Sequence, residues 1–249
     1  MNSLHEKTAL ITGAASGFGL GIATAFVEAG ARVCIVDIDA DAAQAAAANL
    51  GENAKAVPAD ITQNASFSAA VDACYAWGDQ IDILVNNAGV GLLPTPLEQV
   101  AEDDFKRLSQ VNMYAIYLAC QLVVPRMKTA QAGTILNIAS TAGVSPRPNL
   151  TWYNASKGWV ITATKSMAVE LAPFNIRVNA INPVAGETPL LATFMGEDTS
   201  ANRERFLATI PLGRFSTPAD IGAAATFLCS DDAAMITGVA MEVDGGRCV

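Results

Sequence analysis

The chain has 249 residues, of which 51% are hydrophobic, and a formal net charge of −9 at pH 7. Its 15 Lys and Arg residues form no cluster, so we expect no nucleic-acid partner, which would need a concentrated basic surface. No apolar run is long enough to span a bilayer, and residues 1–7 lack the pattern of a secretory signal, so we expect no membrane partner and a cytoplasmic location. The length and the apolar content fit one folded domain over residues 1–249.

Cysteine and histidine are distributed in a way that argues against a metal site. The only histidine is His5, and the chain has no CxxC pair. We expect reduced and mostly buried thiols, with Cys248 the most exposed of them. The five cysteines are Cys34, Cys74, Cys120, Cys229 and Cys248.

The first predicted elements are a strand, a glycine-rich turn and a helix. The apolar run 9–11 precedes the turn 12–19, which has the spacing GxxxGxG, and a helical stretch over 20–28 follows. Glycine lets the backbone approach a pyrophosphate, and the N-terminus of the next helix attracts an anion. The residues expected there are Gly13, Ser16, Gly17, Phe18 and Gly19. By itself such a turn is weak evidence of function, because an ordinary tight turn has the same composition.

The second predicted strand, 33–36, ends in Asp37. A carboxylate at this position accepts hydrogen bonds from both hydroxyls of an adenosine ribose and repels a 2′-phosphate. Neither the glycine turn nor Ile38 offers a basic side chain that would attract such a phosphate. The sequence therefore favours NAD over NADP as a cofactor.

Short β-rich runs alternate with helical stretches along the rest of the chain, at 54–57, 81–85, 134–138, 177–181 and 240–243. This alternation predicts an α/β fold, a single Rossmann-type doubly wound parallel sheet of about seven strands with helices on both faces. Ligands bind such sheets at the carboxyl ends of the strands. The candidate residues that fall there are Gly13, Asp37, Asp60, Asn87, Ser140 and Pro183.

Ser140, Tyr153 and Lys157 form a spacing that indicates proton chemistry. Tyr153 and Lys157 are four residues apart, so they are neighbours on one face of a helix, and the ammonium is expected to favour ionisation of the phenol. A free phenol titrates near about 10, so a tyrosine that exchanges a proton at neutral pH needs such help. Taken alone, a Tyr and a Lys at this spacing also occur by chance.

Together, the glycine turn, the segment Asn86-Asn87-Ala88-Gly89, Ser140 and the Tyr-x-x-x-Lys pair resemble the short-chain dehydrogenase/reductase family, from about residue 7 to 246. The resemblance implies that Tyr153 is the catalytic acid/base and that Ser140 orients the substrate oxygen. It implies that Lys157 lowers the pKa of the tyrosine and binds the nicotinamide ribose. Asn112 matches the fourth catalytic residue of the family, which holds a water in a proton relay.

The same resemblance implies further contacts with NAD. Asp60 and Ile61 match residues at the adenine ring, although Asp60 also suits a helix cap, and Asn87 and Ala88 are expected near the adenine ribose. Asn86 is expected to tie adjacent strands together. The nicotinamide end is expected to be surrounded by Pro183, Gly186 and Thr188. The chain departs from the family's Pro-Gly opening here, because Val184 follows the proline and the glycine comes later.

The segment 187–211 reads as a long irregular stretch, and we expect it to form a substrate lid with an apolar underside; a short amphipathic helix packed on the core is the alternative. Pocket walls are expected from Ala142, Val144, Arg147, Asn149, Trp152, Glu187 and this lid. Arg147 would suit an anionic substrate and Glu187 a polyol, but each also suits a solvated loop charge.

We expect the protein to transfer a hydride reversibly between nicotinamide and a secondary alcohol or ketone, or a sugar-like polyol. The alternatives are a reductase of 3-oxoacyl thioesters, which usually uses NADPH, and a scaffold that binds NAD without catalysis. The helical stretches 105–127 and 159–171 carry more apolar residues than one buried face needs. In the family such helices form subunit contacts, so a homotetramer is expected.

Overall fold

The computed structural model describes residues 3–196 and 199–249; positions 1–2 of the predicted domain and 197–198 of the predicted lid lie outside the described residues. All seven predicted strands are present and pair in parallel in the order β3-β2-β1-β4-β5-β6-β7, which confirms the doubly wound sheet. The strands are β1 (Thr8–Thr12), β2 (Arg32–Asp37), β3 (Ala54–Pro58), β4 (Ile83–Asn86), β5 (Gly133–Ile138), β6 (Ile176–Pro183) and β7 (Ala240–Val243).

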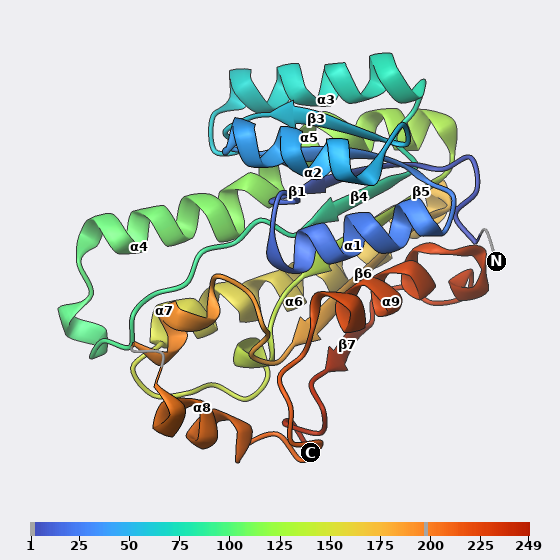
Figure 1. The fold of residues 1–249 in the computed structure, drawn as a ribbon. Helices are drawn as coiled ribbons and strands as arrows, with labels where there is room; N and C mark the ends of the chain where they lie inside the picture. The colour runs from blue at the N-terminus through green and yellow to red at the C-terminus, as the bar shows by residue number, and fades with distance from the viewer. Residues whose placement is uncertain (1–2, 197–198) are drawn as a thin grey trace.

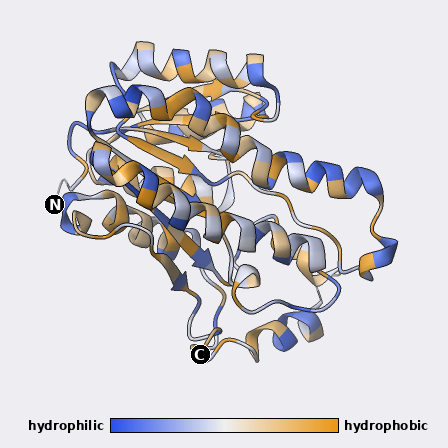
Figure 2. Ribbon diagram, turned by 180° about the vertical axis from the view of Figure 1, so that it is seen from behind, coloured by the Kyte–Doolittle hydropathy of each residue, from blue (hydrophilic) through white to orange (hydrophobic). Residues whose placement is uncertain are grey.

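Helices cover both faces of the sheet, and the strands alternate their side chains between two apolar layers. One layer packs against α1 (Gly17–Glu28), α2 (Ala40–Leu50) and α9 (Pro218–Cys229). The other packs against α3 (Asn64–Gly78), α5 (Ala115–Ala130) and α6 (Thr151–Leu171). Figure 1 shows these helices stacked around the sheet, and in Figure 2 the apolar colour concentrates on the strands between them.

The predicted helix 105–127 is interrupted. The structure has α4 (Glu102–Ser109), one π-helical turn (Gln110–Tyr114) and then α5. Asn112 lies in the π turn and is buried, and its side chain bonds to both backbone groups of Val90. A π turn adds a residue to a helical turn and is frequent at functional sites.

The prediction of an irregular segment at 187–211 is wrong, because this part contains α7 (Leu191–Met195) and α8 (Ser200–Leu207). Leu191 and Met195 are buried with Val184, Ile210 and Phe215 in a small apolar cluster of their own. Helices this short show too little periodicity to be read from sequence. Both lie at the lower left of Figure 1, below α4.

Four 3-10 turns complete the described part, at Leu97–Gln99, Thr141–Gly143, Ala172–Phe174 and Asp231–Ala233. Among the described residues, no helix has the length and apolarity that a membrane crossing requires. The five cysteines are free thiols; Cys34, Cys74 and Cys229 are buried, whereas Cys120 and Cys248 are half-buried. Over residues 3–196 and 199–249, no group of His, Cys, Asp and Glu side chains is arranged to hold a metal ion.

Candidate active site

A cavity of about 800 Å³ opens at the carboxyl ends of the strands. It brings together residues from segments far apart in the sequence, including nearly all of the predicted site. The predicted residues that line it are Gly13, Ser16, Gly17, Phe18, Asp37, Asp60, Ile61, Asn87, Ala88, Ser140, Tyr153, Lys157, Pro183, Gly186 and Thr188. Two predicted residues, Gly19 and Asn112, do not line it.

The glycine turn has the geometry of an anion site. Gly13 and Gly17 have φ of +62° and +55°, a region that other residues enter at a cost, and a Cβ on Gly13 would lie 2.8 Å from the Cα of Ala88. The first turn of α1 contains no acidic residue, and its N-cap, Ser16, makes no side-chain cap. The N–H groups at this helix start are therefore free of a competing anion and fit a pyrophosphate.

Gly19 packs closely against the turn. A Cβ on Gly19 would collide with the carbonyl oxygen of Gly13 and the side-chain nitrogen of Asn87. That nitrogen donates hydrogen bonds to the carbonyls of Thr12 and Gly13, both at 2.9 Å. Gly19 and Asn87 therefore hold the turn in place from behind, and this support depends on contacts between segments that sequence spacing does not reveal.

Asp37 stands at the end of β2, beside the glycine turn. Its Oδ2 accepts from the backbone N–H of Ala15 at 3.0 Å and its Oδ1 from that of Asp39 at 3.2 Å. These bonds orient the carboxylate and leave acceptor capacity for ribose hydroxyls. In the described part of the chain, no Lys or Arg pairs with Asp37, so its charge is uncompensated at this end of the cavity.

Asp60 and Asn86 form hydrogen bonds with nearby parts of the backbone and of the sheet. Oδ1 of Asp60 accepts from the N–H and the hydroxyl of Thr62, so Asp60 caps a turn and not α3, whose N-cap is Gln63. Asn86 donates to Oδ1 of Asn137 on the neighbouring strand at 2.8 Å, which confirms that it ties strands together.

Ser140 and Tyr153 meet where β5 leads into α6. Ser140 begins the 3-10 turn that follows β5, and its Oγ accepts from the N–H of Ala142 at 3.1 Å. Tyr153, in the first turn of α6, is 5% exposed. Burial raises the pKa of Tyr153 to about 12, against the opposing effects of a hydrogen bond from Ser140 and the charge of Arg147.

Lys157 lies one turn further along α6 and is equally buried. Its Nζ donates to the carbonyl of Ile138 at 2.8 Å and lies 6.0 Å from the centre of the Tyr153 ring. Burial lowers the pKa of Lys157 to about 8. Burial has the largest effect on the pKa of the Tyr153 phenol, and Ser140 and Arg147 oppose it. The expected effect of Lys157 on that pKa stays a prediction.

Asn112 is a neighbour of this site, behind the cavity wall. Its amide nitrogen donates to the carbonyl of Val90 at 3.0 Å and to Oγ of Ser156 at 3.2 Å, and its Oδ1 accepts from the N–H of Val90. A Cβ on Gly89 would lie 3.5 Å from both the Asn112 oxygen and the Lys157 nitrogen. The side chain of Asn112 thus fixes the Gly89–Val90 backbone beside Lys157.

The departure at Val184 has a structural reason. β6 continues to Pro183, and the carbonyl of Val184 accepts from Oγ of Ser216 at 3.2 Å. The ring of Phe18 fills the space beside Gly186, where any Cβ would collide with it. The glycine is therefore needed at 186, and its place in the loop is set by the aromatic residue of the glycine turn.

The chain after Gly186 also lines the cavity. The N–H of Thr188 donates to the carbonyl of Gly186 at 2.8 Å, and a Cβ on Gly17 would lie 3.3 Å from the Cβ of Thr188. The segment that follows β6 therefore lies against the glycine turn.

The substrate side of the cavity differs from the predicted walls. Arg147 lines it and is half-buried, which favours a role at the cavity over a solvated loop charge. Of the other candidates, Glu187 lines a separate groove beside α1 and α9. The remaining ones, which do not line the cavity, are Ala142, Val144, Asn149 and Trp152.

The apolar wall of the cavity consists of Val90, Val184, Leu190, Leu191 and Phe194. Val90 was missed, and the only sequence signal for it is that it follows the Asn86–Gly89 segment.

Known proteins resemble the chain over nearly its whole length. The family model described as enoyl-(acyl carrier protein) reductase matches residues 13–247. A 4-formylbenzenesulfonate dehydrogenase of Comamonas testosteroni is 46% identical over 98% of this chain and 99% of its own. A D-threitol dehydrogenase of Mycolicibacterium smegmatis is 40% identical over 98% of this chain and 93% of its own.

Among solved structures, a 3-ketoacyl-(acyl-carrier-protein) reductase from Brucella melitensis complexed with NADH superposes with a TM-score of 0.95, at 50% identity, over 99% of this chain and 100% of its own. An NAD+-bound xylitol dehydrogenase superposes with a TM-score of 0.91 at 29% identity, over 98% of this chain and 99% of its own. The relatives act on different alcohols and carbonyl compounds, and they share the fold with this chain. The chain belongs to the short-chain dehydrogenase/reductase family and is an oxidoreductase that acts on alcohol or ketone groups.

Proposed function

We propose that the protein is an NAD(H)-dependent dehydrogenase that interconverts a secondary alcohol, or a sugar-like polyol, and the corresponding ketone. The observation that carries this proposal is that one cavity holds Ser140, Tyr153 and Lys157 at one end and Asp37 with the glycine turn at the other. When bound, the nicotinamide ring supplies or accepts the hydride. The glycine turn, Asp37 and the donors of Lys157 fit the phosphates, the adenosine ribose and the nicotinamide ribose in that order.

The proton chemistry belongs to Tyr153. In the direction of reduction its hydroxyl gives a proton to the carbonyl oxygen, and in the direction of oxidation it takes the alcohol proton. Ser140 donates to the same substrate oxygen: its Oγ accepts from Ala142, and its one hydrogen, which is given to Tyr153 in the protein alone, turns to the substrate oxygen when substrate binds. Lys157 uses one of its three donors on Ile138 and keeps the others for the cavity.

NAD is proposed over NADP because of Asp37. A 2′-phosphate beside an unpaired carboxylate would be repelled, whereas ribose hydroxyls donate to it. Similarity to structures that contain NADH and NAD+ supports the same choice.

We propose that the segment 187–211 acts as a substrate lid, with Leu190, Leu191 and Phe194 facing the cavity. The ring of Phe194 lies 4.8 Å from that of Tyr153, so the described part of the segment covers the proposed catalytic tyrosine.

We also propose a homotetramer, because large apolar side chains on the outer surface of α5 and α6 remain exposed, among them Tyr117, Trp159 and Val169. Light scattering that gives a monomeric mass would contradict the tetramer.

One experiment tests the function. The purified protein is assayed by NADH absorbance with secondary alcohols, alditols and 3-hydroxyacyl thioesters, each with NAD and with NADP. The proposal expects turnover of at least one alcohol or alditol with NAD and much slower turnover with NADP. Absence of turnover with every substrate, together with tight NAD binding, would indicate a scaffold without catalysis.

A reductase of 3-oxoacyl thioesters is the second candidate. It is favoured by the 50% identity to the Brucella melitensis 3-ketoacyl reductase, whose structure contains NADH. In the same assay this activity would appear as a kcat/KM for the thioester that exceeds those of all the alcohols and alditols.

A further inference from the structure

Arg147 is a cationic side chain in the wall of the catalytic cavity. It stands in the loop between the Thr141–Gly143 turn and α6, and it lines the same cavity as Tyr153. The side chain of Asn154, the residue after Tyr153, donates to the carbonyl of Arg147, which places this loop at the end of the cavity that holds Tyr153.

This guanidinium has no counter-ion. In the part of the chain that the structure describes, no carboxylate oxygen lies within 4.0 Å of Arg147 or of Arg247, its cationic neighbour. Nη1 of Arg247 donates to Oγ of Ser145 at 3.2 Å, two residues before Arg147. Burial, and then repulsion from Arg247, lower the pKa of Arg147. Two neighbouring cations repel each other, and a bound anion relieves this repulsion.

The loop holds Arg147 in a fixed place. Pro146 and Pro148 flank it and restrict the backbone on both sides. Its carbonyl accepts from Nδ2 of Asn154 at 2.8 Å, which ties the loop to the first turn of α6 beside Tyr153. A ligand that binds a group fixed in this way loses little additional conformational freedom in the protein.

In the part of the chain that the structure describes, the guanidinium contacts an aromatic ring. The central carbon of Arg147 lies 4.6 Å from the centre of the Phe206 ring on α8. Stacking on a ring uses the flat face of a guanidinium, whereas its N–H donors point outward in the plane. Among residues 3–196 and 199–249, no acceptor takes a hydrogen bond from those donors, so the contact with Phe206 leaves them available to a ligand.

We propose that Arg147 binds an anionic group of the substrate, so that the pocket selects an alcohol or ketone that carries a carboxylate, sulfonate or phosphate. This inference rests on the proposed function, since it assigns the substrate class of the same site. Val184, Leu191 and Phe194 form apolar wall in the same cavity, so the body of the substrate between its reacting carbon and its anionic end is apolar. An oxyanion matches the fork of donors that a guanidinium presents.

Binding can be measured apart from turnover. In protein saturated with NAD+, a ketone cannot be reduced, because no hydride is available. Calorimetric titration with two matched pairs, 4-acetylbenzoate against 4-methylacetophenone and 4-oxopentanoate against 2-pentanone, then reports the preference for charge. Arg147→Gln removes the charge and Arg147→Lys keeps it. Arg126→Gln is the matched control, because Arg126 also stacks on a ring, that of Tyr75 at 4.1 Å, but pairs with Asp72 on the outer surface.

The proposal expects the anion of at least one pair to bind more than about tenfold more tightly than its neutral partner in the wild type and in Arg126→Gln. The preference should disappear in Arg147→Gln and survive in part in Arg147→Lys, with the affinity for NAD+ unchanged. Equal affinity within both pairs, no binding of either anion, or a preference that persists in Arg147→Gln would overturn it.

Turnover with NADH separates this inference from the proposed function. Reduction of ketones without any preference for the anions, unaltered in Arg147→Gln, would leave the dehydrogenase in place and overturn the role of Arg147. Binding that depends on charge, without turnover of any ketone or alcohol, would keep the anion site and overturn the proposed dehydrogenase.

Discussion

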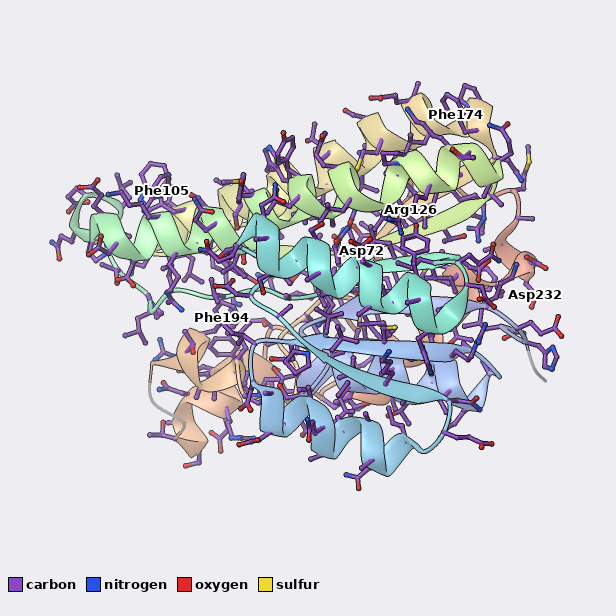
Figure 3. All side chains as sticks on the ribbon, turned by 90° about the horizontal axis from the view of Figure 1, so that it is seen from above. Asp72, Phe105, Arg126, Phe174, Phe194 and Asp232 are labelled. Atoms are coloured by element: carbon purple, nitrogen blue, oxygen red, sulfur yellow. The ribbon has the colours of Figure 1, made fainter. Side chains whose placement is uncertain are left out.

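The ring of Phe194 lies 4.8 Å from the ring of Tyr153, with the two planes inclined at 55°. The two residues come from α7 and α6, and this contact joins the segment 187–211 to the catalytic wall. In Figure 3, Phe194 points into the space between α7 and the helices that carry the site.

Phe194→Ala should lower kcat/KM about tenfold, mainly through a higher KM. An aromatic contact and apolar cover over the substrate are lost, while Tyr153 and Ser140 stay in place. Steady-state kinetics in both directions check this. Phe174→Ala is the control, since Phe174 contacts Lys128 at the other end of the molecule (Figure 3). A kcat/KM that falls equally in the two variants would argue against a lid.

Tyr153→Phe should lower kcat at least about 10³-fold while leaving the Kd for NADH within about twofold. The substitution removes the hydroxyl proposed to exchange the substrate proton and keeps the apolar ring against Phe194. Rates are followed by NADH absorbance and binding by NADH fluorescence. Retained activity would refute the assignment of Tyr153 as the acid/base.

Asp37→Ala should reduce the preference for NAD over NADP by about 10- to 100-fold, because hydrogen bonds to a charged carboxylate and its repulsion of a phosphate are both lost. The ratio of the two kcat/KM values, with one alcohol as substrate, measures the change. Asp39→Ala serves as a comparison, since Asp39 caps α2 from a neighbouring position. An unchanged ratio in Asp37→Ala would show that another residue selects the cofactor.

Alcohol oxidation should speed up as the pH rises from about 7 to 9. Burial holds the pKa of Tyr153 at about 12 in the protein alone, so the proton-accepting phenolate is the minor form and grows with pH. Ser140→Ala should move the rising limb to higher pH, because the hydrogen bond from Ser140 lowers the pKa of Tyr153. Profiles of kcat/KM check both. A limb that moves to lower pH would contradict the role of Ser140.

Thr217→Ala should lower the free energy of unfolding by about 1 kcal/mol, a fall in Tm of about 2–4 °C. Thr217 and Asp220 form a reciprocal capping box at the start of α9, a helix of the core, with bonds of 3.2 and 2.8 Å. Thr199→Ala, which removes the cap of the peripheral helix α8, is the matched control and should change Tm less. Calorimetry measures both, and equal shifts would place the two helices in one cooperative unit.

Sequence alone determined the features that depend on short spacing. The glycine turn, the strand that ends in Asp37 and the Tyr153–Lys157 pair are local patterns, and backbone geometry fixes what they present at the ends of parallel strands. The order of these motifs, at their spacings, also identified the family and the seven strands. These features need no knowledge of what packs against them.

Only the tertiary structure decided what surrounds each group. Burial makes the phenol of Tyr153 harder to ionise, and the fold places Arg147 in the wall of the cavity. The side chain of Asn112 bonds to the backbone of Val90, and the absence of a side chain at Gly186 leaves space for the ring of Phe18. Whether a group is desolvated, lacks a counter-ion or is closely packed depends on segments that are distant in the chain. The local spacing of residues therefore does not predict these properties.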